Sequence, residues 1–314
     1  MNKNLVITVR PIIILVVFLI LSNFFSLFFF AKHKWLDSRY NDQYPFIEIS
    51  RNFIPQEHFI VNFQPLRDDL KKLVQEASGQ EISLYFEFLN TGANISINPD
   101  LKIWPASLTK LPLAMIVLKK EEEGDWGFED KLAILEEDKN DKSGELFSRT
   151  LGSLTIKELL SELLISSDNT AFNALMRNIS VLDIDKLVSG IGLEELFTEE
   201  GRMSAKEYSR ILRSLYVSSF LKKGNSSRIL DWLIKSPFVD YLSQGMPEGT
   251  VFAHKFGENE TYSTYADSGI VYLASRPYLL SVMIKSEPEN GGREQAMALM
   301  KEISQKVYRY VKTY

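Results

Sequence analysis

The sequence predicts an α+β fold: an antiparallel five-stranded sheet flanked by N- and C-terminal helices, with an all-helical insertion, preceded by one transmembrane helix. Two observations predict this fold. Strand patterns occur in two groups, within residues 82–97 and 251–286, and a long stretch of helical periodicity separates them. A continuous apolar run also lies close to the N-terminus. Because tight turns join consecutive strands, we expect the strands to pair antiparallel.

The apolar run covers residues 11–31, which is long enough to cross a bilayer as a helix. A cleavable signal peptide has a shorter apolar core and small residues at its exit, whereas Phe28-Phe29-Phe30 leads directly into Ala31-Lys32. We therefore expect an uncleaved signal anchor and a single-pass protein of the cell membrane. Basic residues flank the run on both sides, so charge alone does not set its orientation. The expected parts are a cytoplasmic tail (1–10), the span (11–31), a stalk (32–65) and an extracytoplasmic catalytic domain (66–314).

Periodicity places the elements of this domain in order. Apolar residues at helical spacing predict an amphipathic helix over 66–74. Alternating residues over 82–88 and 95–97, with turn residues between them, predict a β-hairpin. Three later strands and a final helix are predicted over 251–256, 265–275, 278–286 and 294–311. Within the insertion, about 105–235, helices are predicted over 111–120, 156–164, 170–176, 184–187 and 205–216.

Composition excludes several classes of protein. The net charge of −5 and the lack of a basic stripe with interleaved aromatics argue against a nucleic-acid partner. The chain has no cysteine, which removes disulfides, cysteine-bound metals and thiol nucleophiles. Of its three histidines, His33, His58 and His254, only His254 lies where a Ser-His-Asp triad would need it. We expect all three to be ordinary structural or surface residues, and no metal or cofactor.

Three short motifs carry the chemistry of the sequence. They are Ser107-Leu108-Thr109-Lys110 at the start of an apolar helix, Ser167-Asp168-Asn169 after a second helix, and Lys255-Phe256-Gly257 in a late strand. A serine hydroxyl needs a nearby base to act as a nucleophile, and a spacing of three on a helix brings Lys110 to Ser107. A buried lysine loses its proton readily, and unpaired N–H groups at a helix start suit a developing oxyanion.

A serine–lysine pair alone is weak evidence, because a second one, Ser219-Phe220-Leu221-Lys222, occurs without the other motifs. Together the three motifs resemble S-x-x-K, S-D-N and K-T-G of the penicillin-recognising serine hydrolases. From about Leu66 onward the chain resembles a class A β-lactamase-like domain. The stretches that carry this resemblance are FLNTGANISINPD, LTIKELLSELLISSDNTAFNALM and AHKFGENETYSTYADSGIVYLA.

The resemblance implies a β-lactamase/transpeptidase-like fold and a role for each motif residue. Ser107 would be the acylated nucleophile and Lys110 its base. Ser167 would relay a proton to the leaving nitrogen, and Asn169 would contact the substrate amide. Lys255, followed by Gly257, would face Ser167 and a substrate carboxylate. The oxyanion hole would consist of the backbone N–H groups of Ser107 and Glu258.

Two departures from the family pattern bear on function. Phe256 replaces a threonine, so it offers no hydroxyl to a substrate carboxylate. Class A enzymes carry a long loop with E-x-x-L-N, whose glutamate activates the deacylating water. This loop looks deleted here: no E-x-x-L-N occurs, and only a short loop, residues 192–201, leads to the predicted helix at Ala205. Candidate substitute bases lie in it, although solvated turn acidity is the simpler interpretation; they are Glu194, Glu195, Glu199 and Glu200. Without a base, an acyl-enzyme forms and persists.

We therefore expect a membrane-anchored serine hydrolase that acts on a β-lactam or a peptidoglycan-like peptide with a D-amino amide bond. One alternative is a D,D-peptidase or penicillin-binding protein. A second is a tethered β-lactam or cell-wall sensor that acylates without efficient turnover. A retired structural domain is a third hypothesis, and the intact Ser107, Lys110, Ser167, Asn169 and Lys255 argue against it.

Overall fold

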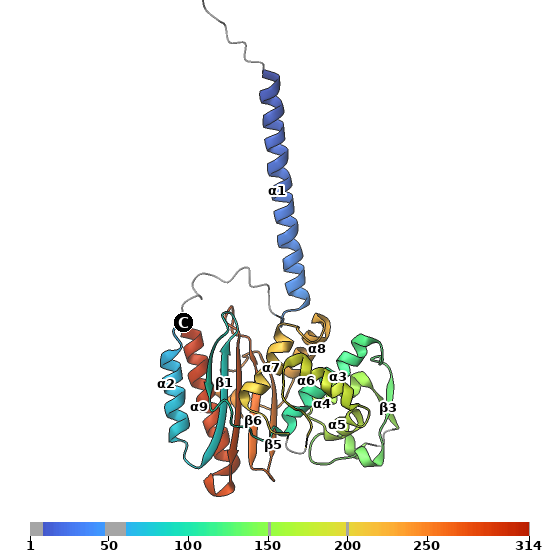
Figure 1. The fold of residues 1–314 in the computed structure, drawn as a ribbon, viewed down its shortest axis with the longest axis vertical. Helices are drawn as coiled ribbons and strands as arrows, with labels where there is room; N and C mark the ends of the chain where they lie inside the picture. Colours follow the sequence, from blue (N-terminus) through green and yellow to red (C-terminus); the bar gives the residue numbers. More distant parts are fainter. Residues whose placement is uncertain (1–8, 48–60, 150–151, 199–200, 314) are drawn as a thin grey trace, which may run out of the picture. The chain divides into compact units, whose positions relative to one another are not determined.

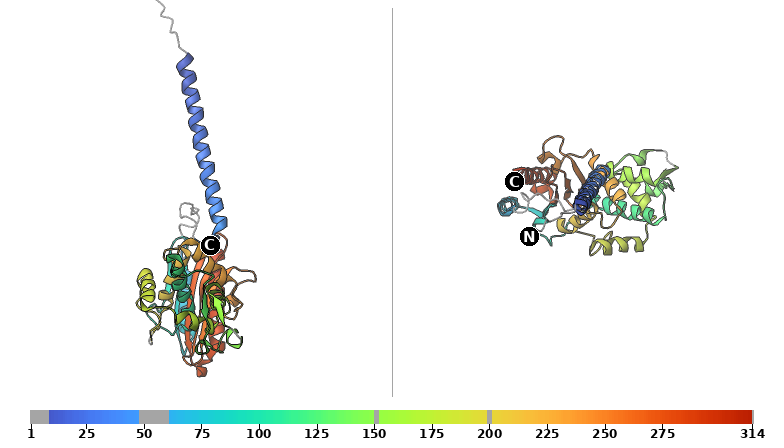
Figure 2. Two further views of the ribbon diagram at one scale, coloured as in Figure 1. Left: turned by 90° about the vertical axis from the view of Figure 1, so that its right-hand side faces the viewer. Right: turned by 90° about the horizontal axis from the view of Figure 1, so that it is seen from above.

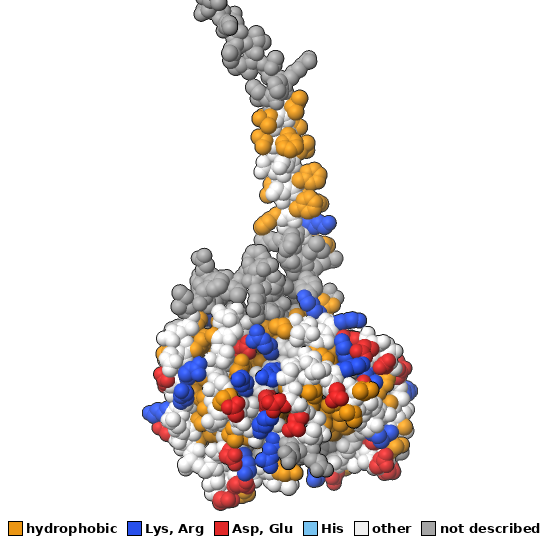
Figure 3. All heavy atoms as spheres, viewed as in Figure 1, with side chains coloured by type: hydrophobic (Ala, Val, Ile, Leu, Met, Phe, Trp, Pro, Cys, Tyr) orange, Lys and Arg blue, Asp and Glu red, His pale blue; other side chains and the backbone are white. Residues whose placement is uncertain are grey.

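The computed structural model describes residues 9–47, 61–149, 152–198 and 201–313, in two compact units that divide between Pro45 and Phe46. The first unit is one long helix, α1, Val9–Gln43 (Figure 1). Its segment Ile13–Lys32 has a mean hydropathy of 2.7 and contains no buried residue, and a space-filling view shows its hydrophobic side chains (Figure 3). By length and composition this segment suits a membrane anchor or a signal sequence. The helix continues to Gln43, so the start of the predicted stalk is helical.

The second unit is built on the predicted five-stranded antiparallel sheet, whose strand order is β2-β1-β7-β6-β5. The strands are β1, Gln80–Phe88; β2, Ala93–Ile97; β5, Phe252–Asn259; β6, Thr264–Val271; and β7, Tyr278–Ser286. The hairpin from the start of the domain thus pairs with the last strand of the chain, because β1 lies between β2 and β7. This arrangement leaves β5 as the edge strand that faces the helical insertion.

Two helices from opposite ends of the domain cover one face of the sheet. They are α2, Gln64–Glu76, and α9, Gly292–Thr313, which lie side by side (Figures 1 and 2). The main apolar core lies beneath them, and alternate β1 residues such as Leu84, Phe86 and Phe88 belong to it. The opposite face of the sheet is covered by α7, Ala205–Tyr216. The sequence therefore predicted both the sheet and its flanking helices.

The insertion is mainly helical, as predicted, but it is not all-helical. Its further helices are α3, Lys110–Glu123; α4, Ile156–Ile165; α5, Asn169–Met176; α6, Val181–Ile191; and α8, Lys223–Ile234. A two-stranded ribbon joins β3, Lys131–Ala133, to β4, Ser153–Thr155. Strands of three residues are too short to show an alternating pattern, so periodicity does not predict this ribbon.

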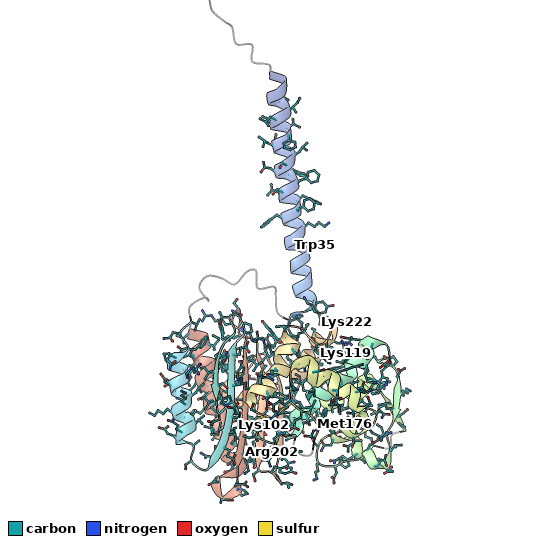
Figure 4. The ribbon with its side chains drawn as sticks, in the orientation of Figure 1. Trp35, Lys102, Lys119, Met176, Arg202 and Lys222 are labelled. Carbon is teal, nitrogen blue, oxygen red and sulfur yellow. The ribbon has the colours of Figure 1, made fainter. Side chains whose placement is uncertain are left out.

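A backbone bridge fixes the segment that leads to the first motif. The N–H of Ile103 donates to the carbonyl of Met203 at 3.0 Å, and the N–H of Met203 donates back at 3.1 Å. Figure 4 labels Lys102 and Arg202, the residues that precede this pair. The bridge ties the approach to Ser107 to the end of the short loop before α7.

Candidate active site

Ser107 lies in a 3₁₀ turn, Ala106–Thr109, that leads directly into α3. We expected a helix start at this serine, and the tighter turn has the same effect, because residues three apart share one face of a 3₁₀ helix. Lys110 begins α3, and its Nζ lies 3.1 Å from Ser107 Oγ. Ala106 has a φ of 49°, a left-handed conformation that is uncommon outside glycine and that places a strained residue next to the serine.

Lys110 is 2% exposed and is surrounded by oxygen atoms. Besides Ser107 Oγ, its Nζ donates to Ser167 Oγ at 3.1 Å, to Asn169 Oδ1 at 2.6 Å and to the Ser167 carbonyl. Burial lowers the pKa of Lys110 to about 7, and the nearby Asp168 carboxylate opposes this shift only in part. An amine with this pKa is partly neutral at pH 7, as a proton acceptor for a serine hydroxyl must be.

The second motif is held by its aspartate. Asp168 is the N-cap of α5: one carboxylate oxygen accepts from Ala171 N at 2.8 Å and the other from Leu146 N at 2.9 Å. This fixes the turn in which Ser167, with a φ of 55°, points to Lys110. The sequence motif thus combines two residues that face the site with one that builds the turn.

The third motif comes from the edge strand β5. Lys255 is 1% exposed, and its Nζ donates to Ser167 Oγ at 2.8 Å. Burial, and secondarily the charge of Lys110, hold the pKa of Lys255 well below its usual range. Gly257 lies against the serine turn: a Cβ there would stand 2.8 Å from Ser107 N. A glycine is therefore required for β5 to approach the turn this closely.

Two polar residues of the site escaped sequence analysis. Ser143 Oγ donates to the Ser167 carbonyl at 2.8 Å, and Asn140 Oδ1 accepts from Asn169 Nδ2 at 3.0 Å. Both belong to the loop between the ribbon strands β3 and β4, to which we assigned no role from the sequence. The only signal was a run of turn-forming residues, Lys139 to Gly144, and such runs are common in loops that carry no function.

A cleft of about 760 Å³ opens above these motifs. Of the predicted site residues, Ser107, Lys110, Asn169 and Glu258 line it, whereas Ser167, Lys255 and Gly257 lie behind the lining. The other lining residues come from the serine turn, the 140–143 loop, α5 and the end of β5. They are Trp104, Ala106, Thr109, Asn140, Lys142, Ser143, Phe172, Asn173, Phe256, Asn259, Glu260 and Thr261.

The short loop before α7 brings no carboxylate to this cleft among the residues that the structure describes. Glu194 pairs with Lys102 at 2.5 Å, and Glu195 accepts from Thr198 at 3.0 Å. The ring of Phe197 instead contacts Phe172 of the cleft wall, at 6.3 Å between centroids. The other two candidates, Glu199 and Glu200, lie outside the described residues.

His254 takes no part in the cleft. Its Nδ1 lies 2.8 Å from Asp267 Oδ1, and both side chains are buried in the sheet. His33 and His58 fall among the side chains that the structure does not describe. Among the residues that the structure describes, the side chain in contact with Ser107 Oγ is therefore a lysine and not a histidine.

An antiparallel sheet with a helical insertion, and serine and lysine side chains in contact at its edge, define a protein of the penicillin-recognising serine hydrolase type. Residues 65–311 match the model of the beta-lactamase enzyme family, and the chain belongs to this family. No curated protein sequence matches the chain.

Solved structures share the fold at low sequence identity. The L158E mutant of PBP-A, an acyl-enzyme complex with penicillin G, superposes with a TM-score of 0.73 at 21% identity, over 80% of this chain and 97% of that one. A beta-lactamase from Sphaerobacter thermophilus DSM 20745 gives a TM-score of 0.72 at 18% identity, over 81% and 99%. An ancestral class A beta-lactamase gives 0.70 at 21%, over 78% and 99%. The predicted fold is thus confirmed.

Proposed function

We propose that this protein is a membrane-anchored, outward-facing serine hydrolase that forms an acyl-enzyme on Ser107 with a β-lactam or an acyl-D-amino amide. The observation that carries the proposal is the position of Lys110 Nζ, 3.1 Å from both Ser107 Oγ and Ser167 Oγ. One buried amine thus contacts a nucleophile and a relay hydroxyl at the same time. Membership of the beta-lactamase enzyme family supports the same chemistry.

In the proposed acylation, protons pass between Ser107, Lys110 and Ser167, whose side chains are in hydrogen-bond contact at Lys110 Nζ. Neutral Lys110 accepts the proton of Ser107, whose Oγ attacks the carbonyl carbon. The N–H groups of Ser107 and Glu258 would stabilise the oxyanion, and their segments meet where Gly257 touches the serine turn. On collapse, the leaving nitrogen takes the Ser167 proton, which Lys110 replaces. This last step requires the Ser167 hydroxyl to reach the cleft, from whose lining it is absent in this structure.

Hydrolysis of the acyl-enzyme needs a second base, and the described part of the short loop supplies none to the cleft. This favours slow deacylation, and with it the D,D-peptidase, penicillin-binding or sensor form of the activity over fast antibiotic destruction. The specific observation that favours slow deacylation is the contact of Phe197 with Phe172. Where the short loop meets the cleft wall, it presents an aromatic ring and not a carboxylate.

Intact-mass measurement of the full-length chain tests the proposal. After addition of benzylpenicillin and then of a cephalosporin, we expect an adduct that maps to Ser107 and persists. The Ser107→Ala variant should form none, and Lys110→Ala should acylate about 10²- to 10⁴-fold more slowly, the usual loss on removing a general base. Drug consumption without an adduct would contradict slow deacylation. If the Ser107→Ala variant still forms an adduct, the assignment of Ser107 as the nucleophile is wrong.

A further inference from the structure

Three aromatic side chains form an aromatic wall beside the third motif: Phe238, Tyr241 and Phe256. The ring centroids of Phe256 and Phe238 are 4.0 Å apart, and Tyr241 stacks on Phe256 at 6.3 Å. Phe256 is the member that lines the cleft. Because two rings back it, Phe256 is fixed in place and cannot swing aside to admit a charged group without breaking that packing.

The aromatic wall screens Lys255 from the cleft. Lys255 Nζ lies 4.6 Å from the centre of the Phe256 ring, and it donates to the Phe256 carbonyl at 3.2 Å as well as to Ser167 Oγ. It is 1% exposed and absent from the cleft lining. Phe256 itself brings no hydroxyl. A K-T-G motif offers a cation and a hydroxyl to a substrate carboxylate. Here the cation, Lys255, is buried, and the hydroxyl is missing because Phe256 takes its place.

Two acidic side chains lie on the cleft wall close by: Glu258 near the end of β5, and Glu260 in the turn that follows it. Arg293 pairs with Glu258 at 3.0 Å, but on the side of Tyr241, whose hydroxyl also donates to Glu258. Arg293 also binds Asp240 at 2.9 Å and is not among the residues that line the cleft. A carboxylate placed next to Phe256 would thus meet acidic and aromatic groups.

We propose that the leaving-group side of the site selects acyl donors that carry an uncharged, apolar group where a carboxylate would otherwise sit, with Phe256 as the residue that determines this specificity. This proposal rests on the proposed function, because the leaving-group side of the cleft is defined there as the side where Ser167 gives its proton to the leaving nitrogen. Ester- or amide-capped donors fit this chemistry. A free carboxylate would lose its solvation beside the rings and gain no paired cation in return.

Two probes that differ only at this carboxylate test the inference: benzylpenicillin and its methyl ester. Acylation of Ser107 in the detergent-solubilised full-length chain is followed by intact mass, and pseudo-first-order rates are compared. We expect the ester to react about tenfold faster, a ratio that corresponds to about 1.4 kcal/mol. Faster or equal reaction of the free acid would overturn the inference, and Lys142, the exposed cation of the opposite loop, would then be the anchor to examine.

Two variants at one position separate the hydroxyl from the ring. Phe256→Thr restores the hydroxyl and opens the path to Lys255, so the preference for the ester should disappear or reverse. Phe256→Leu keeps an apolar side chain without a hydroxyl and should retain the preference. If Phe256→Leu also reverses it, or Phe256→Thr leaves it unchanged, Phe256 does not set the specificity. Labelling of Ser107 by a fluorophosphonate confirms that each variant is folded.

The outcomes separate this inference from the proposed function. If neither the acid nor the ester labels Ser107, the proposed acylation by β-lactams is wrong and the inference falls with it. If both label Ser107 and the acid is faster, the proposed function stands and only the inference fails.

Discussion

Lys110 illustrates how a common residue acquires a specific role. Its position three residues after Ser107 is visible in the sequence, but its lowered pKa comes from burial. Its contacts with the oxygens of Ser107, Ser167 and Asn169 also form only in the fold. The sequence also contains Ser219-Phe220-Leu221-Lys222 with the same spacing. There Lys222 is only the residue before α8, and its backbone N–H donates to Glu122. Spacing identifies candidates, and the surrounding oxygens distinguish them.

Acylation should depend on pH through Lys110. Its pKa is about 7 in the folded chain against a usual 10.5, so the amine is mainly protonated below about pH 6 and mainly neutral above about pH 8. The acylation rate should rise across this window and then level off. Stopped-flow or quenched intact-mass measurements over pH 5.5–9 check it. A flat profile would show that Lys110 is not the base.

The same shift has a consequence for stability. Between pH 7 and 10.5 the unfolded chain binds a proton at Lys110 that the folded chain does not. The contribution of this lysine therefore favours the folded state more as the pH rises through that interval. A Lys110→Met variant should lack this contribution, and comparison of the two chains by urea unfolding at pH 7 and pH 9.5 measures it. Equal pH dependence in both chains would contradict it.

Gly257 is a residue whose importance is invisible in the motif alone. An alanine there would place its Cβ 2.8 Å from Ser107 N and 2.9 Å from the Pro105 carbonyl. We expect Gly257→Ala to push β5 away from the serine turn and to slow acylation by at least about tenfold. Gly249→Ala is a control for the loss of a glycine outside the site, since its Cβ would meet nothing within 4 Å, although its positive φ adds strain. Equal acylation by Gly257→Ala and the parent would contradict this close approach.

At the scale of elements, strand β1 shows what alternation predicts and what it misses. Its apolar positions lie in the core, and alternation of this kind is typical of a strand whose polar face is solvated. The polar residues of β1 do not fit that pattern. They are buried as well, because α7 covers that face: Ser83 Oγ accepts from Ala205 N at 3.0 Å, and Glu87 pairs with Arg213. The alternation of apolar and polar residues predicts which face of the strand is polar. It does not predict whether a helix covers that polar face.

The contact between β1 and α7 can be tested at this ion pair. Glu87 is 1% exposed and accepts from Tyr85 as well as from Arg213, so Arg213→Ala leaves a buried carboxylate with one donor fewer. We expect a loss of about 2 kcal/mol in the free energy of unfolding, measured by urea denaturation. The double variant Arg213→Ala, Glu87→Gln should recover part of it. If the double variant instead loses further free energy of unfolding, the unpaired charge of Glu87 is not the cause of the loss in Arg213→Ala.

Helix boundaries were predicted best where caps agree with periodicity. The helix predicted over 205–216 is α7 without change, and Ser204 and Glu207 form a capping box at its start. The helix predicted over 184–187 is longer in the structure, Val181–Ile191. Periodicity missed its first turn because the apolar Val181 and Leu182 are exposed there and break the amphipathic pattern. A local capping box of Ser180 and Asp183 begins this helix where the apolar pattern fails.

At the scale of the whole molecule, the proposed membrane anchor in α1 can be tested separately from the site. If the apolar segment is an uncleaved anchor, the full-length chain should sediment with membranes and resist extraction at alkaline pH. The intact mass of the membrane-extracted chain should then include residues 1–31. A soluble chain that lacks them would identify a signal peptide and contradict the proposed anchor. The test needs no enzymatic activity.

The strand order has a consequence for how the site comes into being. Gln80 of β1 lies opposite Ser286 of β7, a pairing across 206 residues of chain, and β5 joins β1 only through β6 and β7. Such non-local contacts give a high contact order and slow folding, because the entropy of closing a long loop is lost before the pairing is gained. During synthesis Ser107 and Lys110 emerge long before Lys255. The sheet that places Lys255 beside the serine turn is complete only when the last strand has been made. A chain that is cut short before β7 therefore contains Ser107, Lys110 and Lys255 but not the sheet that holds them together.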